Sequence, residues 1–172
     1  MANDCNYEMK IKGSKETIQR VIDCLKANYN YYEGKPAHKH FFRVFECVDE
    51  DEYEIYGDNG DGTFTAFVWG YCAWSVWSCM MKGEHTYYDD VKRNHPDTFM
   101  GTCLEEQSQD CEIEVFSEEP GMGFSEHYYF KNGVCLIDTS VEMREEWDEE
   151  YEECELFNPN RENNCDGFKF IL

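Results

Sequence analysis

Apolar and polar residues alternate at the start of the chain and then change to a helical period. A half-buried strand is predicted over 6–12 by alternate apolar positions at Tyr7, Met9 and Ile11. Ser14 follows as a helix N-cap. Apolar residues at helical spacing then predict an amphipathic helix over 15–31.

The middle of the chain predicts further strands. Residues 40–48 have the pattern of a strand, and alternation returns at 53–56. Residues 62–81 carry no charge, which raises the alternative of a membrane span, but they contain no Leu or Ile. We therefore expect a central strand over 63–74, apolar on both faces, and a short helix capped by Ser75.

The second half predicts an antiparallel meander. Residues 83–98 are polar and turn-rich, and a short helix is expected near 97–109. Three strand-like runs follow, and the turn Lys131-Asn132-Gly133 between the last two is a strong hairpin signal. The predicted strands cover 111–117, 124–130 and 134–141.

The last thirty residues predict an acidic helix. Met143, Trp147, Tyr151 and Cys154 recur on one helical face, and the positions between them are acidic except for Arg144. We expect this helix to pack on the domain through Trp147 and Tyr151, and 168–172 to add a terminal strand. The expected organisation is an α+β domain over 1–141, with the acidic helix and tail of 142–172 packed on it.

Charge is distributed unevenly along this pattern. The chain has 37 acidic residues and 15 Lys plus Arg, a formal net charge of −22. Residues 1–45 hold five acids and eight bases, so the whole excess of acid follows them. Charge of this size indicates solubility or partner binding, and it opposes contact with nucleic acid or an anionic membrane. Aromatic residues make up 16% of the chain, which argues against a disordered acidic protein.

The ten cysteines favour reduced thiols. The first residues lack the apolar segment of a signal peptide, so we expect an intracellular protein without disulfides. No Cys-x-x-Cys pair is present, and we expect no metal and no cofactor. The Gly57–Gly62 segment resembles a calcium loop but lacks the two key carboxylates, so it predicts a turn.

No motif predicts catalysis. His127 beside Glu126 is the candidate general base, but a lone histidine in a tyrosine-rich strand is more often a packed residue. Phosphate-loop, dinucleotide and hydrolase motifs are absent from the sequence, and we expect no enzyme activity.

Several short motifs carry a resemblance to a known family. They are Asn6-Tyr7, Ile11-Lys12-Gly13, Trp69-Gly70, Ala73-Trp74-Ser75 and the turn from Glu119 to Phe124. In this order of elements the chain resembles the YubB-like family of ferredoxin-like domains carried by phages and plasmids. The resemblance covers about residues 5–141 and implies a ferredoxin-like antiparallel sheet with a helix on one face.

Two functional hypotheses follow from these observations. The first is a cytoplasmic inhibitor, acting in a bacterial host cell, that mimics nucleic acid and binds a basic defence protein such as a nuclease or CRISPR effector, as acidic anti-CRISPR proteins do as a class. The alternative is a ferredoxin-like RNA- or protein-binding module whose acidity serves only solubility. The residues expected to bind the partner are Glu145, Glu146, Asp148, Glu149, Glu150, Glu152 and Glu153, with Asp49, Glu50, Asp51 and Glu52 second.

Overall fold

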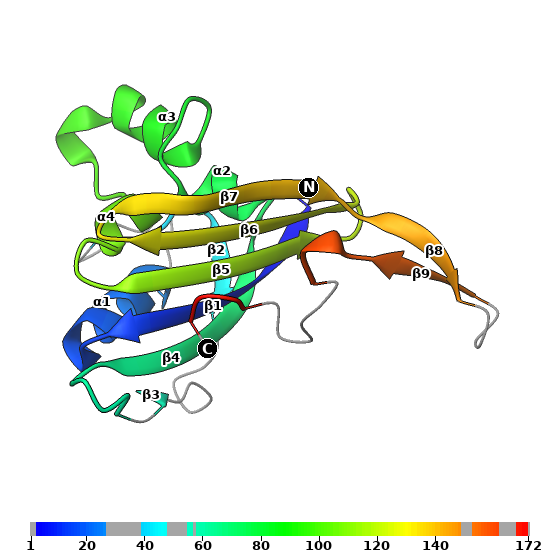
Figure 1. Ribbon diagram of the computed structural model, residues 1–172. Helices are drawn as coiled ribbons and strands as arrows, with labels where there is room; N and C mark the ends of the chain where they lie inside the picture. Colours follow the sequence, from blue (N-terminus) through cyan, green and yellow to red (C-terminus); the bar gives the residue numbers. More distant parts are fainter. Residues whose placement is uncertain are drawn as a thin grey trace.

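The computed structural model has one large antiparallel sheet with helices on one side (Figure 1). It describes residues 3–26, 39–47, 55–56, 58–148, 153–161 and 168–171. Seven strands form the sheet in the order β2-β4-β1-β5-β6-β7, with the short β3 also paired to β4. The fold is therefore mixed α/β and rich in strands.

The strands and helices of the first half follow the predicted pattern closely. The elements are β1 (Asp4–Gly13), α1 (Lys15–Lys26), β2 (Val44–Cys47), β3 (Ile55–Tyr56), β4 (Phe64–Ala73) and α2 (Val76–Met80). Ser14 and Ser75 both cap helices, because their hydroxyls accept hydrogen bonds from the backbone N–H groups of Thr17 and Ser78. The predicted end of the first helix, 27–31, lies outside the described residues.

The second half contains the predicted meander and one unpredicted helix. Its elements are α3 (Tyr87–Asn94), α4 (Leu104–Gln107), β5 (Glu112–Glu119), β6 (Phe124–Lys131) and β7 (Val134–Glu142), with a 3₁₀ turn at Pro96–Thr98. Asn132 and Gly133 both have positive φ, 53° and 74°, so the predicted hairpin turn is of the type that matches strand twist. The sequence pattern missed α3, which Thr86 caps.

The predicted acidic C-terminal helix is wrong. Residues Arg144–Asp148 and Glu153–Phe157 form the strands β8 and β9 of a separate two-stranded sheet, followed by a 3₁₀ turn at Pro159–Arg161. A helix would place acids four residues apart all along its exposed face, and such like-charge pairs repel one another. The predicted terminal strand is also wrong, because 168–171 have no strand structure.

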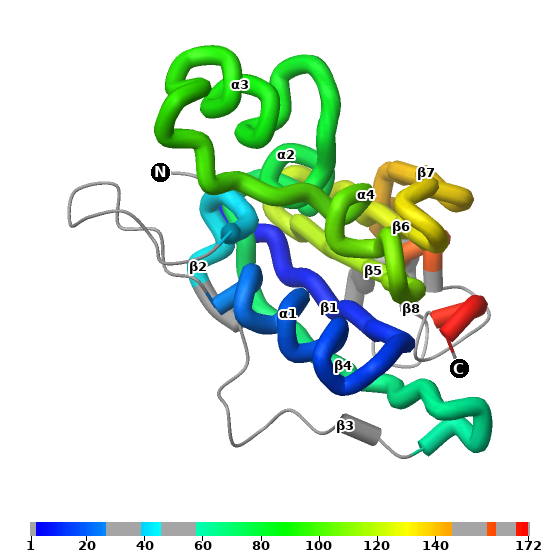
Figure 2. The backbone as a smooth tube through the Cα atoms, turned by 90° about the vertical axis from the view of Figure 1, so that its left-hand side faces the viewer, coloured from blue at the N-terminus to red at the C-terminus, as the bar shows by residue number. Residues whose placement is uncertain are grey.

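The core lies between the sheet and α1. Alternate residues of β1, from Cys5 to Ile11, pack with Ile18, Val21 and Ile22 of the helix. Figure 2 shows α1 and α2 on one side of the sheet and the C-terminal segment on the other. We call the side opposite these helices the front face; it faces the viewer in Figure 1.

The register fixes which residues meet on the front face. One row across four strands contains Trp69, Glu8, Phe116 and His127. The next row contains Phe67, Lys10, Glu114 and Tyr129. The expectation that β4 is covered on both faces is wrong, because Trp69 and Tyr71 remain 38% and 42% exposed.

Candidate functional site

Of the eleven residues expected to bind a partner, four lie on the paired strands β8 and β9. Glu145, Glu146 and Asp148 lie on β8, and Glu153 lies on β9. Glu149, Glu150 and Glu152 are outside the described residues, as is the whole second cluster, Asp49 to Glu52. The hairpin therefore brings together four of the predicted residues, on strands rather than on a helix.

The register of the hairpin pairs acids with acids. Glu146 stands opposite Glu155, and Asp148 stands opposite Glu153. Positions two apart along a strand are separated by about 7 Å, and neighbouring strands by about 5 Å, so four acidic positions fall within one small patch. Like charges directly opposite each other destabilise a strand pair. This face of the ribbon therefore has four acidic positions, with Arg144 of β8 two residues before Glu146.

The base of the hairpin is fixed to the main sheet. The backbone N–H of Met143 donates to the carbonyl of Gly123 over 2.7 Å, at the point where β7 ends. On the return strand, Asn158 donates to Glu118 over 2.7 Å, and the buried Asn160 donates to Ser125 over 3.0 Å. Beyond these contacts the hairpin extends away from the sheet (Figure 1). The acidic ribbon is therefore a projection on a fixed base.

His127 is part of a buried polar cluster. Its Nε2 lies 2.9 Å from Oε1 of Glu114, and both side chains are buried. Phe116 stacks on its ring at 4.1 Å. Glu126, the residue beside this candidate general base, points to the opposite face of the sheet, where its carboxylate accepts the backbone N–H of Val76 at the start of α2. The ring of His127 is therefore buried and packed between aromatic side chains in this arrangement.

Burial and hydrogen bonds act oppositely on the Glu114 carboxyl. Burial alone would raise its pKa, but hydrogen bonds from His127 and from the backbone of Lys169, Ile171 and Phe170 outweigh that effect. The pKa of Glu114 is therefore held below its usual range, and the group is a carboxylate at neutral pH. The alternation of β5 puts Glu114 beside Phe116 on the front face, but nothing local in the sequence shows that it binds the C-terminal segment.

Glu126 forms a second buried cluster, on the helix side of the sheet. Its carboxylate accepts hydrogen bonds from Ser117 at 2.6 Å, from Tyr128 at 3.0 Å and from the backbone N–H of Val76 at 2.8 Å. Burial raises the pKa of Glu126 despite these bonds. The group ties β5, β6 and the start of α2 together, which is a structural role.

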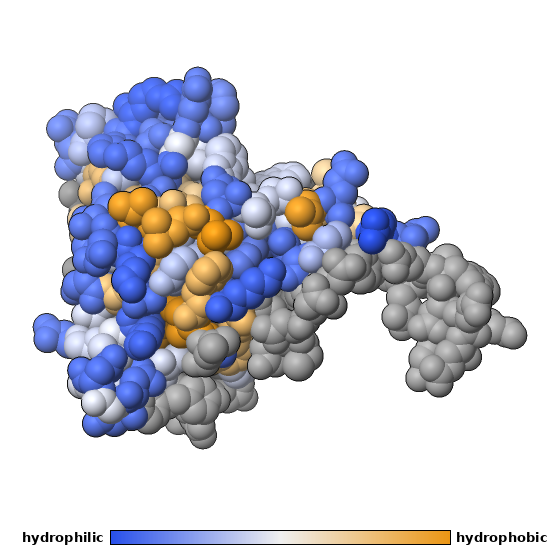
Figure 3. All heavy atoms as spheres, viewed as in Figure 1, coloured by the Kyte–Doolittle hydropathy of each residue, from blue (hydrophilic) through white to orange (hydrophobic). Residues whose placement is uncertain are grey.

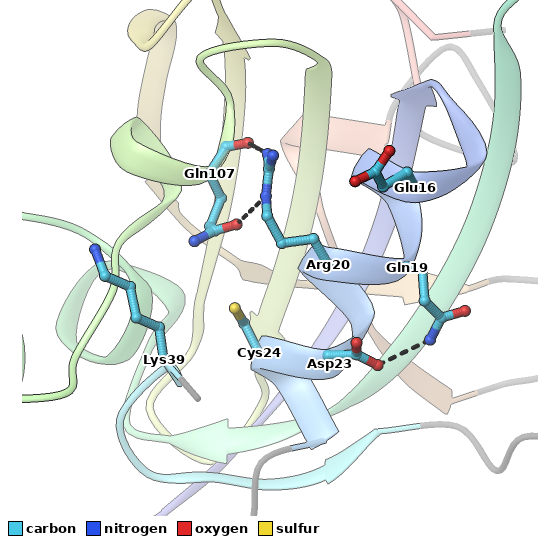
Figure 4. A pocket seen from close by; sticks show the side chains of 7 residues that line it. All are labelled: Glu16, Gln19, Arg20, Asp23, Cys24, Lys39 and Gln107. Carbon is cyan, nitrogen blue, oxygen red and sulfur yellow. Dashed lines mark hydrogen bonds between the residues drawn. The ribbon is translucent and has the colours of Figure 1, made fainter. Parts of the chain in front are cut away.

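An open groove of about 580 Å³ runs beside α1 (Figure 4). Arg20 and Lys39 supply its cations. Arg20 donates to both carboxylate oxygens of Asp110 and to Gln107, and Lys39 pairs with Glu106 at 3.1 Å. Burial raises the pKa of Cys24, which also lines the groove, to about 11. A protonated thiol beside paired cations supplies neither a nucleophile nor a free anion site.

The seven cysteines whose side chains the structure describes are free thiols, and no cluster of metal-ligating side chains occurs among the described residues. Six of the seven are buried. Burial raises the pKa of Cys103 and of Cys111 to about 12. Thiols in such surroundings are poor nucleophiles and weak metal ligands.

Among the described residues, no helix is both long and apolar enough to cross a membrane. No protein-family model, curated protein or solved structure matches the chain significantly.

Proposed function

We propose that the protein is a non-enzymatic inhibitor that binds a basic nucleic-acid-handling protein and blocks its nucleic-acid site. The charge of −22 attracts cationic surfaces from a distance, and it repels the nucleic acid with which the inhibitor would compete. A nuclease or CRISPR effector of a bacterial defence system has a channel of this chemistry, since it holds phosphates with Lys and Arg.

The single observation that carries this proposal is the pairing of acids in the β8–β9 hairpin. The register places Glu146 opposite Glu155 and Asp148 opposite Glu153, and like charges at facing positions destabilise a strand pair. A cationic partner placed against the ribbon would neutralise these charges. Relief of the repulsion between the acids would then contribute to the free energy of binding. A role limited to solubility does not require acids to be placed directly opposite one another on a projecting ribbon.

We also infer a ferredoxin-like topology for the sheet. The order β2-β4-β1-β5 supports it. The connection from β1 through α1 to β2 passes over β4, and the connection from β4 through α2–α4 to β5 passes over β1. Both crossovers then join strands that run parallel with one antiparallel strand between them. On this view 1–141 form the domain, and 142–172 add the acidic extension.

A second candidate function is direct RNA binding by the front face. Trp69 and Tyr71 are exposed on β4, where bases could stack on them. The neighbouring basic residues are already engaged, since Lys10 lies 4.8 Å from the ring centroid of Phe168 and Lys12 lies 4.0 Å from Asp61. The cross-strand partner of Trp69 is Glu8, which repels phosphate. We therefore rank this function below protein binding.

A capture experiment tests the proposal. The full-length protein, immobilised, is exposed to a bacterial lysate rich in defence nucleases at low and then moderate salt. We expect capture of a nucleic-acid-binding protein that remains bound at moderate salt and is released by a short DNA or RNA duplex. If only abundant basic proteins bind, and all leave together as salt rises, the acidic surface is merely solvating and the inhibitor proposal fails.

A further inference from the structure

The front face holds residues 168–171 in a site built by side chains from four strands. Glu114 comes from β5, His127 and Tyr129 from β6, Lys10 from β1 and Phe67 from β4. These strands are far apart in the sequence from the segment they hold. The site has two parts: one binds the backbone of the segment, and the other contacts its side chains.

A single carboxylate, that of Glu114, binds the backbone of residues 169–171. Glu114 is fully buried, and its Oε1 accepts the N–H of Lys169 at 2.8 Å. Its Oε2 accepts the N–H groups of Phe170 at 3.0 Å and Ile171 at 2.8 Å. Three consecutive backbone N–H groups converge on one carboxylate only where the backbone turns, and residues 169 and 170 form a bend. These contacts do not depend on which side chains the segment carries. His127 contacts Oε1 from the sheet side and fixes the carboxylate.

The side-chain contacts define a pattern. Phe168 is 2% exposed, meets Phe116 edge-on at 5.3 Å and lies under the ammonium group of Lys10. Phe170 stacks on Tyr129 at 4.5 Å and 12°. Ile171 is 1% exposed, whereas Lys169 is on the solvent side. The segment thus presents to the site, in order, a buried aromatic residue, an exposed residue, a stacked aromatic residue and a buried aliphatic residue.

We propose that this face is a peptide-binding site for a partner protein, whose segment has the pattern aromatic-x-aromatic-aliphatic with basic flanking residues, and that residues 168–171 are its resident competitor. The charge of the chain supports a basic occupant, because the whole molecule carries −22 and the x position faces solvent. The chain's own segment is preceded in the sequence by the acids Glu162 and Asp166, which this field disfavours.

The surface around the site has room for a longer segment. Figure 3 shows apolar atoms gathered on this face, over the ends of β6 and β7 and toward the C-terminal segment. Val134 and Leu136 of β7 are each 54% exposed, and Phe170 is 44% exposed. An apolar surface beside an occupied site is typical of a larger binding area than four residues fill. This proposal does not depend on the acidic hairpin.

A labelled peptide tests the site in the full-length protein. The probe is the fluorescein-labelled heptapeptide KKFKFIL, and the variant Phe168→Ser weakens the resident segment. We expect the peptide to bind F168S at least tenfold more tightly than the wild type, and adding Glu114→Ala to F168S to abolish that binding. Lys169→Ala is the matched control and should behave as the wild type. The same peptide with its first Phe replaced by Ser should not bind.

Three outcomes for the F168S variant would contradict the proposal. If F168S keeps its circular dichroism spectrum but does not bind the peptide, the site is not a peptide site. If F168S unfolds, the segment belongs to the core and the proposal is wrong. If F168S forms dimers as its concentration rises and the peptide does not compete, the occupant is a second copy and not a partner.

Hydrogen exchange of the wild type gives an independent measurement. Displacement by a partner requires the segment to leave the sheet without global unfolding. We expect the amides of Lys169, Phe170 and Ile171 to exchange at least a hundredfold faster than those of β1. Exchange of all these amides at one slow, common rate would overturn the proposal.

Discussion

Two glutamates of neighbouring strands show how environment decides the behaviour of a residue. Glu114 on β5 and Glu126 on β6 are both buried, but on opposite faces of the sheet. For Glu126 burial wins, and its pKa is raised. For Glu114 the hydrogen bonds from His127 and the C-terminal backbone win, and its pKa is lowered. The two groups therefore contribute to stability with opposite dependence on pH.

The Glu114→Gln variant tests the first of these shifts. Because the folded pKa lies below the unfolded value of about 4.3, the carboxylate stabilises the fold above that pH and loses this contribution as pH falls through the folded pKa. We expect E114Q to lower the free energy of unfolding by about 1–3 kcal/mol at pH 7, since buried donors lose their acceptor. Chemical denaturation from pH 7 to pH 3 measures it, and the difference from the wild type should shrink toward pH 3.

The Glu126→Gln variant is the matched comparison. A raised folded pKa means that the wild type loses stability, relative to E126Q, as pH rises from about 4.3 through the folded pKa. The same denaturation series should therefore give a difference of opposite slope to that of E114Q. Parallel slopes for the two variants would contradict the opposite assignments of these carboxyl groups.

Cysteine reactivity tests burial at the same scale. Burial raises the pKa of Cys24 and Cys135 to about 11 and of Cys103 and Cys111 to about 12. At pH 8 we expect these thiols to alkylate more than about a hundredfold more slowly than free cysteine, because the thiolate is the reactive form. Mass spectrometry after denaturation without reductant should show ten labelled cysteines, and a smaller number would reveal disulfides.

At the scale of elements, the helices and strands that were predicted correctly are those that a local sequence pattern determines. β1, α1, β4 and the β5–β6–β7 meander follow from alternation, helical spacing and the Asn132-Gly133 turn. The β8–β9 hairpin does not follow from the local pattern. The four-residue spacing of Met143, Trp147 and Tyr151 fits a helix, and the pairing of β8 with β9 depends on residues later in the chain. The role of the acids at 145–153 in partner binding stays a prediction, and the helix predicted for them is wrong.

Tertiary contacts explain the other failures. Glu114 meets Lys169 to Ile171 across more than fifty residues, which no spacing in the sequence reveals. Trp69 and Tyr71 have the composition of a covered strand, yet the front face leaves them exposed. In both cases the environment depends on which segment docks on the sheet, and this depends on the whole fold.

The Glu155→Lys variant tests the hairpin register. It turns the Glu146–Glu155 pair into an opposite-charge pair, so we expect the free energy of unfolding to rise by about 0.2–1 kcal/mol at low salt. The gain should fall at 1 M salt, where charges are screened within about 3 Å. Thermal melts at both salt concentrations measure it, with Glu155→Gln as the intermediate control. A loss of stability at low salt would contradict the register.

At the scale of the whole molecule, the charge is large enough to direct association. Residues after 45 carry a net charge of −25 and the first 45 carry +3, and the hairpin projects part of the negative charge from the sheet. General acidity and a specific acidic site both predict binding that weakens with salt. They differ in whether the position of the charges matters, so only substitutions matched in charge can separate them.

The most direct measurement compares two triple charge reversals in binding to the captured nucleic-acid-handling protein. One variant is E145K/E146K/E153K in the hairpin, and the other is D4K/E84K/D97K at exposed positions elsewhere. Both change the net charge equally. At low salt we expect the hairpin variant to bind at least about tenfold more weakly than the wild type, a loss of about 1.4 kcal/mol or more in binding free energy. The control variant should bind about as tightly as the wild type. Equal weakening of both, or stronger RNA binding by the hairpin variant with its protein binding intact, would contradict the proposed inhibitor.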